Sequence, residues 1–335
     1  MVFRIAPRED RAALLARLAA DPRVRLAQPL QRFDTLAAPP ATTPSAPAAP
    51  YNDPYFGLQR GFARIDAADA QQWTRGEGVR VALIDTGVDG GHPDLHGRIE
   101  SRRNFVDADA AQFEADRHGT AVAGVIAADA NNREGIVGVA PGARVLALKA
   151  CWQGPQRGDG AQCNSFTLAQ ALTVAIESGA RVINLSLGGP ADPLLGQLAS
   201  YALKRGVVVI GAVPPDGRTD GFPDGVPGVI AVDSAEHPSA SGVLRAPGSE
   251  VLTLTPGGHY DFVSGSSLAA AHVSGAAALL LQVNPRLDPA AVRDLLVRTA
   301  AADGVINICA AVALLQPQGG CVAQNGTTAY GSAAP

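Results

Sequence analysis

Lysine is almost missing from this chain of 335 residues, which contains only Lys149 and Lys204. Arginine therefore supplies nearly all of the positive charge, and the 31 acidic residues outnumber the 27 basic ones to give a net charge of −4. A nucleic-acid-binding surface or a polybasic membrane patch needs an excess of positive charge. The composition therefore argues against both kinds of partner.

Long hydrophobic runs are missing as well. The longest apolar run extends from Leu268 to Val283 and contains His272, Ser274 and Gly275. A membrane-spanning helix needs about 20 mostly apolar residues, so no span is expected. The first ten residues lack a basic segment followed by an apolar stretch, so we expect no signal peptide in this sequence. Either the protein stays inside the cell, or its export segment lies outside this sequence.

Cysteine is scarce, but its placement is informative. Cys151 and Cys163 flank one polar, Gly-containing stretch, and Cys309 and Cys321 flank another. Four cysteines allow three pairings, and we expect the two local ones, Cys151–Cys163 and Cys309–Cys321, because they close short loops. The spacings match no zinc pattern. Disulfides indicate an oxidising compartment; the alternative is four unpaired thiols in a cytosolic protein.

The first 36 residues predict a small αβ segment. Residues 2–6 and 24–30 are typical of strands, and residues 8–20 predict a helix that ends before Pro22. This segment has too little core to fold alone. Residues 37–50 are rich in alanine, proline, threonine and serine, which indicates a linker.

Residues 51–316 predict the main domain, and residues 317–335 a C-terminal tail. In the main domain, short apolar strands alternate with helical stretches. We expect strands over 79–85, 145–150, 181–187, 207–212 and 229–234, and helices over 119–128, 165–178, 194–205 and 267–283. Continuous valine, isoleucine and leucine strands between helices indicate an α/β fold whose parallel sheet is covered on both faces. Ligands bind such sheets at the carboxyl ends of the strands.

Three short segments place a reactive side chain beside small residues. They contain Asp85 in Val-Ala-Leu-Ile-Asp-Thr-Gly, His118 in His-Gly-Thr, and Ser267 in Ser-Gly-Ser-Ser-Leu-Ala-Ala. Each segment alone is compatible with a turn, a helix start or a loop. Together, in the order Asp, His, Ser, they indicate a catalytic triad.

From about Tyr51 to Leu315 the chain resembles the subtilisin-like serine proteases, the subtilases. The order of the three reactive residues is that of this family. Further segments follow one another in the family's order, at residues 51–59, 92–95, 138–141, 182–189 and 227–232. The resemblance implies a three-layer subtilisin-like fold with a mostly parallel central sheet. It also implies a serine endopeptidase that acts on protein or peptide substrates and needs no cofactor for its chemistry.

The resemblance also implies roles for individual residues. Ser267 would be the nucleophile, His118 the general base and acid, and Asp85 the group that orients the imidazole and stabilises the imidazolium. The resemblance implies that the substrate backbone pairs with Ser186, Leu187 and Gly188. It implies that Gly211 and Ala212 line the pocket for the side chain before the cut.

One residue of the family pattern is missing. The family normally has an asparagine after the strand at 207–212 that donates to the oxyanion, but no asparagine occurs between Val207 and Val232. An ungapped comparison places Pro214 there, and proline has no donor; Asp216 could donate only if protonated. Such a loss costs roughly 10²–10³ in rate. The chain is thus expected to be a slow protease, a protease with a substitute donor, or a non-catalytic peptide-binding pseudoprotease.

Two further expectations come from the resemblance. Asp94 and Asn132 match positions that often bind a structural calcium, although two oxygens are far short of the six to eight that calcium needs. The alternative is that both residues simply shape turns. Residues 1–36 resemble part of an inhibitory prodomain, which would act as an intramolecular inhibitor until the linker is cut; the alternative is an accessory segment that is never removed. With the expected disulfides, the resemblance implies a secreted or periplasmic protein.

Overall fold

The computed structural model describes residues 10–24, 50–153, 161–237 and 242–316. The chain divides into two units, Met1–Ala48 and Ala49–Pro335. In the first, helix α1 (Arg11–Ala19) begins after Asp10, whose carboxylate accepts hydrogen bonds from two backbone N–H groups of the first turn. The strand expected over 2–6 lies outside the described residues, as does all but the first residue of the strand expected over 24–30.

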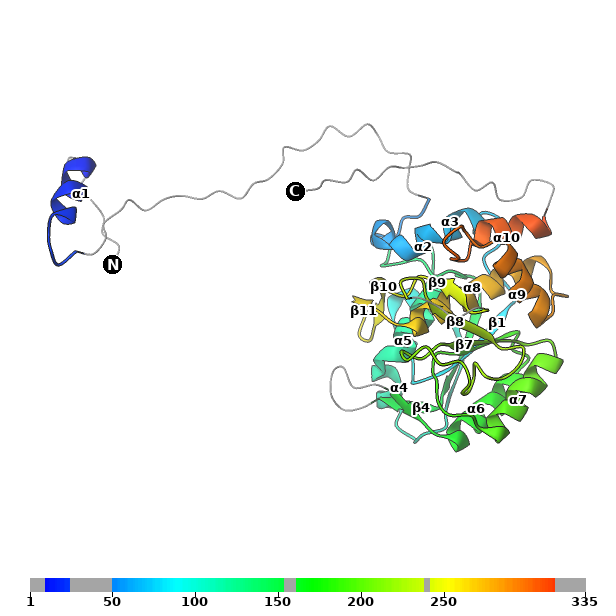
Figure 1. Ribbon diagram of the computed structural model, residues 1–335. Coiled ribbons are helices and arrows are strands. Elements are labelled where there is room, and N and C mark those ends of the chain that lie inside the picture. The colour runs from blue at the N-terminus through cyan, green and yellow to red at the C-terminus, as the bar shows by residue number, and fades with distance from the viewer. Residues whose placement is uncertain (1–9, 25–49, 154–160, 238–241, 317–335) are drawn as a thin grey trace. The chain divides into compact units, whose positions relative to one another are not determined.

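The second unit is built on a seven-stranded sheet in which every pair of neighbours is parallel (Figure 1). In spatial order its strands are β2 (Ile99–Asn104), β3 (Arg144–Lys149), β1 (Arg80–Asp85), β6 (Val182–Leu185), β7 (Val208–Ala212), β8 (Ile230–Ser234) and β9 (Leu244–Ala246). The expected α/β fold with a parallel central sheet is confirmed. Strand β1 lies inside the sheet, between β3 and β6, and its carboxyl end is where the chain switches from one side of the sheet to the other, which is the usual ligand position.

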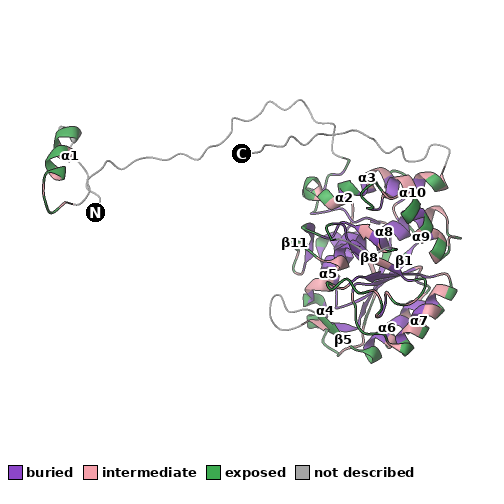
Figure 2. Cartoon of the chain, in the orientation of Figure 1, coloured by how far each residue is buried: buried purple, intermediate pink, exposed green. Residues whose placement is uncertain are grey.

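Helices cover both faces of this sheet, because alternate strand residues point to opposite sides. Val81 and Leu83 pack in one core cluster with α5 (Arg117–Ala127) and α8 (Ser266–Val283), whereas Ala82 and Ile84 pack in a second cluster with α6 (Ser165–Glu177) and α7 (Pro193–Lys204), so that the two faces have separate cores. Figure 2 shows the buried sheet and α8 between more exposed outer helices. This is the three-layer arrangement that the sequence predicts.

Helix α8 runs through the interior of the domain. All its residues from Leu268 to Leu281 are buried, and a side chain at Gly275 would overlap Val139. By length and composition α8 could cross a membrane, but 78% of it is buried inside the structure. A core helix of a soluble domain has this same character, so α8 is not a clear membrane span.

Several smaller elements were not expected from the sequence. The edge strand β2 reads Ile-Glu-Ser-Arg-Arg-Asn and has no apolar periodicity, and the hairpins β4–β5 and β10–β11 are short. Helix α9 (Pro289–Arg298), in contrast, begins where Asp288 and Pro289 predict a helix start. The remaining elements are β4 (Cys151–Gln153), β5 (Ala161–Cys163), β10 (Val251–Thr255), β11 (His259–Val263), α2 (Arg60–Arg64), α3 (Ala67–Ala70), α4 (Ala110–Ala115), α10 (Ile308–Leu315), and the 3₁₀ turns η1 (Phe56–Leu58) and η2 (Pro93–Leu95).

One of the two expected disulfides is confirmed. Cys151 and Cys163 face each other across the β4–β5 hairpin and are bonded. Cys309 on α10 is disulfide-bonded too, and its expected partner, Cys321, lies outside the described residues. The bonded hairpin lies next to the start of α5, because the side-chain oxygen of Gln153 accepts a hydrogen bond from the backbone N–H of Arg117 at 3.0 Å.

Candidate active site

Asp85 and His118 meet at the carboxyl end of β1. Asp85 is the last residue of this strand and is buried, and its Oδ1 lies 2.7 Å from Nδ1 of His118. The same oxygen accepts the backbone N–H of Thr86 at 2.6 Å. The other carboxylate oxygen is buried and has no hydrogen-bond partner among the described residues. The carboxylate is therefore held against the imidazole through one of its oxygens, which also accepts the Thr86 N–H.

His118 is the second residue of α5 and remains partly exposed, with 30% of its side chain accessible. Burial on its own would lower the pKa of His118, but the charge of Asp85 and the hydrogen bond to it outweigh this effect and hold the pKa above its ordinary value. Since Asp85 occupies Nδ1, the other ring nitrogen, Nε2, is left for proton transfer.

A buried ion pair supports this corner of the site. Lys149 lies beside Asp85 in the register of β1 and β3, and its ammonium contacts the Asp116 carboxylate, with both side chains fully buried. Asp116 precedes α5, and its Oδ2 also accepts the backbone N–H of Gly87 at 2.8 Å. The pair thus joins the end of β3, the turn after Asp85 and the start of the helix that carries His118.

Ser267 is the second residue of α8, one position later than the helix start at Ser266. Its hydroxyl donates to the Ser186 carbonyl at 3.3 Å, and the Ser186 hydroxyl donates to the Ser267 carbonyl at 3.1 Å. Two buried residues complete the link from β6 to α8: Asn184 donates to the Ser186 hydroxyl at 2.9 Å and accepts from Ser274 at 2.8 Å. Within the described residues, Ser267 makes no hydrogen bond to His118.

The backbone N–H of Ser267 is available as a donor. In the described parts of the chain no acceptor pairs with it, while the next N–H, of Leu268, bonds the Gly265 carbonyl at 3.0 Å. An N–H at the start of an eighteen-residue helix also has the positive end of the helix dipole behind it. The position is suited to stabilise negative charge that develops next to the serine.

The substrate-binding residues expected from the sequence lie around the ends of β6 and β7. Ser186 and Leu187 follow β6 directly, and Gly188 lines a cavity of about 480 Å³. Gly211 and Ala212 are buried at the end of β7 and do not line this cavity.

The residues considered for the oxyanion donor line the same cavity. Pro214 lies against Gly188, about 3.5 Å from where a side chain would begin. Asp216 is exposed, and its carboxylate accepts the backbone N–H of Arg218 at 3.1 Å. Neither residue is arranged as a donor here.

Asp94 and Asn132 are brought together, but as a hydrogen-bonded pair. The amide nitrogen of Asn132 donates to one oxygen of Asp94 at 2.8 Å, and the backbone N–H of Ile136 donates to the other at 2.9 Å. No group of three or more histidine, cysteine, aspartate or glutamate side chains within the described ranges could hold a metal ion. A structural calcium at Asp94 thus stays a prediction without support from these contacts.

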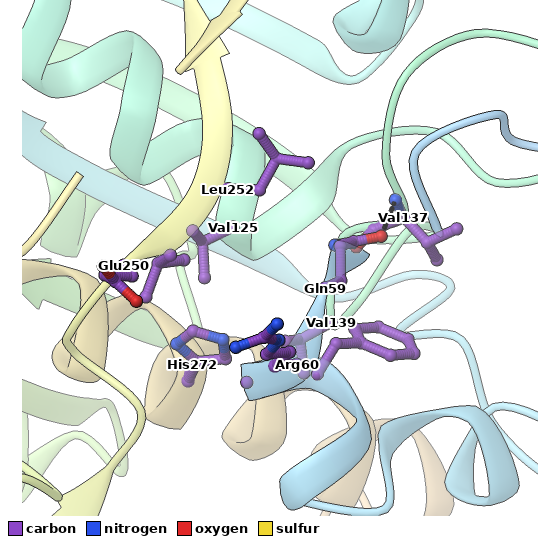
Figure 3. A pocket seen from close by; sticks show the side chains of 11 residues that line it. Gln59, Arg60, Val125, Val137, Val139, Glu250, Leu252 and His272 are labelled. Atoms are coloured by element: carbon purple, nitrogen blue, oxygen red, sulfur yellow. Dashed lines mark hydrogen bonds between the residues drawn. The ribbon is translucent and has the colours of Figure 1, made fainter. Parts of the chain in front are cut away.

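A second, much smaller cavity of about 10 Å³ lies between α2 and α8 and is lined by none of the three reactive residues (Figure 3). Gln59, Arg60 and His272 are among its lining residues. Nδ1 of His272 lies 2.8 Å from the Leu268 carbonyl, and burial lowers the pKa of this imidazole to about 4. His272 is therefore neutral at ordinary pH and is a structural side chain of α8.

Four side chains of the site could not be assigned to it from the sequence. Asn184 and Ser274 fall inside apolar segments, and only their polarity in a buried strand and a buried helix marks them. Asp116 and Lys149 are far apart in sequence, but a rare lysine at the end of an apolar strand is a signal that a buried acidic partner exists.

Residues 76–326 match the family model described as "Subtilase family". The chain is 37% identical to thermitase of Thermoactinomyces vulgaris over 242 residues, covering 68% of this chain and 84% of thermitase. It is 38% identical to an intracellular serine protease of Paenibacillus polymyxa, covering 68% of this chain and 73% of that protein. A protease structure from Pseudoalteromonas arctica matches with a TM-score of 0.69 and 26% identity, covering 80% of this chain and 100% of that one.

Proposed function

Since the chain belongs to the subtilase family and is a subtilisin-like serine endopeptidase, a hydrolase that needs no cofactor for its chemistry, we propose that Asp85, His118 and Ser267 carry out the reaction. The observation that supports this most directly is the 2.7 Å contact between Asp85 and His118 at the carboxyl end of β1. Protein or peptide is the substrate class that the family implies.

In the proposed mechanism, the Ser267 hydroxyl turns from the Ser186 carbonyl toward Nε2 of His118 and attacks the carbonyl carbon of the peptide bond. His118 takes the serine proton and passes it to the leaving amine. Asp85 keeps the proton on Nδ1 and stabilises the imidazolium. Hydrolysis of the acyl-enzyme then repeats these proton transfers through His118, with water as the nucleophile and the Ser267 oxygen as the leaving group.

We propose that the oxyanion is stabilised mainly by the backbone N–H of Ser267. Proline at position 214 has no N–H, and Asp216 accepts rather than donates. A site with one donor fewer is expected to be slower by roughly 10²–10³ than one with both. The competing proposal is a pseudoprotease that holds peptide in the same cleft without cutting it, and the missing donor is the observation in its favour.

We further propose that residues 1–36 act as an intramolecular inhibitor, that residues 37–50 are a linker cut by the enzyme itself, and that residues 51–316 form the catalytic domain, followed by a tail over 317–335. The disulfide between Cys151 and Cys163 supports a secreted or periplasmic location, because such bonds persist in oxidising compartments.

The test is intact-mass analysis after treatment with a fluorophosphonate probe, which labels only an activated serine. We expect one adduct on the wild type and none on Ser267→Ala. The same spectra report processing, because cleavage in the linker removes the N-terminal mass from the wild type and not from the variant. No adduct on wild type, either full-length or lacking residues 1–50, would favour the pseudoprotease; identical intact N-termini in wild type and variant would refute self-cleavage.

The pH dependence of kcat/KM should report His118. Its imidazole must be neutral to accept the serine proton, so activity is lost as pH falls through its pKa. Because Asp85 raises this pKa, we expect the acid limb at a pH above the ordinary histidine value of about 6.5. His272, with a pKa of about 4, will not contribute at that pH. A pH series with an uncharged peptide substrate measures the limb; a midpoint well below 6.5 would contradict the pairing with Asp85.

A further inference from the structure

The cavity of about 480 Å³ lies between the segment that follows β6 and the loop that follows β7. One of its walls begins at Gly188, two residues after Ser186, and Ser186 exchanges two hydrogen bonds with Ser267. The opposite wall is the loop after β7, from Pro214 to Asp224. A substrate whose scissile carbonyl is at Ser267 and whose backbone follows the segment after β6 would direct the side chain before the cut into this cavity.

Backbone, rather than side chains, joins the two walls. Gly189 and Phe222 exchange two backbone hydrogen bonds, of 2.9 and 3.0 Å. A side chain at Gly221 would overlap the Gly189 carbonyl, so only glycine permits this close approach. The cavity between the walls is therefore held open by a fixed backbone frame.

The lining of the cavity is acidic. It contains three carboxylates, of Asp216, Asp220 and Asp224, and one guanidinium, of Arg218. Arg218 is engaged by Asp220 at 2.9 Å, and both side chains are about 70% exposed, at 69% and 71%. Since Arg218 is already paired with Asp220 at the rim, the carboxylates of Asp216 and Asp224 are left without a salt-bridge partner among the described residues.

Asp224 differs from the other two acids because it is partly buried. Its Oδ1 is shielded from solvent and has no hydrogen-bond partner among the described residues. This oxygen occupies the space that a side chain on Gly211 would fill, so the glycine of β7 makes room for the carboxylate. Burial, with a smaller contribution from the charge of Asp233, raises the pKa of Asp224 to about 6.

An unpaired, partly buried carboxylate is costly until a cation or a donor reaches it. A large apolar side chain in the cavity would remove water from Asp224 and supply no partner. A guanidinium or ammonium would supply both charge and donors, and a guanidinium can present two N–H groups to one carboxylate.

We propose that this cavity receives the substrate side chain before the scissile bond, and that Asp224 selects arginine or lysine there, with arginine preferred. The inference rests on the proposed endopeptidase function and identifies its substrate class as peptide bonds that follow a basic residue. The carboxylates of Asp216 and Asp220 at the rim add long-range attraction for the same cation.

The test compares peptide substrates that differ only in the residue before the cut: arginine, its uncharged isostere citrulline, and leucine. For the full chain we expect kcat/KM to be about 100-fold higher for arginine than for citrulline. In Asp224→Asn this ratio should fall below about 10. Asp294→Asn, an exposed acid on α9 that pairs with Arg298, changes the net charge equally and should leave the ratio as it is.

The ratio also has an expected pH dependence. Protonation of His118 lowers both rates equally and cancels, so the ratio reports the cavity alone. It should rise as pH increases from about 5 to 7, because Asp224 loses its proton in this range while Arg218 stays charged. The other acids near Asp224 are Asp216, Asp220 and Asp233, of which Asp233 contributes to the raised pKa of Asp224.

The outcomes separate this inference from the function on which it rests. Cleavage with a ratio near 1, or with leucine preferred over arginine, would overturn the basic preference and leave the endopeptidase intact. If no peptide is cleaved, the proposed function fails, and binding to Ser267→Ala decides the rest. Tighter binding of the arginine peptide than of the citrulline peptide by about tenfold or more supports the pocket; equal binding refutes it.

Discussion

An Asp85→Asn variant is expected to fold normally and to lose about 10⁴-fold in kcat. Oδ1 of Asp85 accepts from both Thr86 and His118, so the amide that replaces the carboxylate has two orientations. If the amide oxygen takes the position of Oδ1, both hydrogen bonds remain, but the NH₂ group is buried at the position of Oδ2, which has no partner. The charge that stabilises the imidazolium is lost as well. If the NH₂ group takes the position of Oδ1, it opposes the Thr86 N–H and forces the wrong tautomer of the His118 imidazole.

The measurement is kcat on a peptide substrate, with circular dichroism to check the fold. Asp294→Asn serves as the control, because it removes one negative charge from an exposed ion pair far along the chain. The His118 pKa should also fall in Asp85→Asn, since the carboxylate charge that raises it is lost. Retention of a tenth or more of the wild-type kcat would show that Asp85 does not support His118.

Lys149→Met is expected to lower the free energy of unfolding by about 3–5 kcal/mol. The substitution leaves the Asp116 carboxylate fully buried with no cation beside it. Adding Asp116→Asn should restore about half of the loss, because the neutral amide can still accept the N–H of Gly87 and no longer carries a buried charge. Urea unfolding of the wild type, both single variants and the double variant completes the cycle.

The control for this cycle is the exposed pair of Arg298 and Asp294, whose side chains are 61% and 59% accessible. Arg298→Met should cost less than about 1 kcal/mol, as exposed pairs do. If Lys149→Met costs no more than this control, the buried pair is not a support of the site. The activity of the double variant then shows whether the position of His118 relative to Asp85 depends on the pair, because Asp116 connects the turn after Asp85 to the helix of His118.

Much of the fold could be predicted because its signals are local. Apolar strands such as that of Val81 to Ile84 and the small-residue helix after Ser267 follow simple periodicities, and the three reactive residues lie in short motifs. The absence of an asparagine near Pro214 is likewise readable from the letters alone.

What could not be predicted depends on contacts between distant segments. Lys149 meets Asp116 from 33 positions away, and only the register of β1 and β3 brings this pair next to Asp85. The Asp224 carboxylate is shielded and unpaired only because its loop folds over Gly211. Short hairpins such as β4–β5 also lack the length that makes a strand pattern visible.

The burial of α8 has a consequence for how this enzyme fails. The helix that carries the proposed nucleophile near its start is buried over most of its length, and it contacts the sheet as well as α5 and α10. Amides in its buried part, from Leu268 to Leu281, are expected to exchange hydrogen with solvent only when the domain opens as a whole, so the body of the helix cannot move while the rest stays folded. The activity that remains after heating therefore measures the fraction of molecules that are still folded. An inactive but folded form of such an enzyme has to arise from covering the cleft rather than from moving the serine.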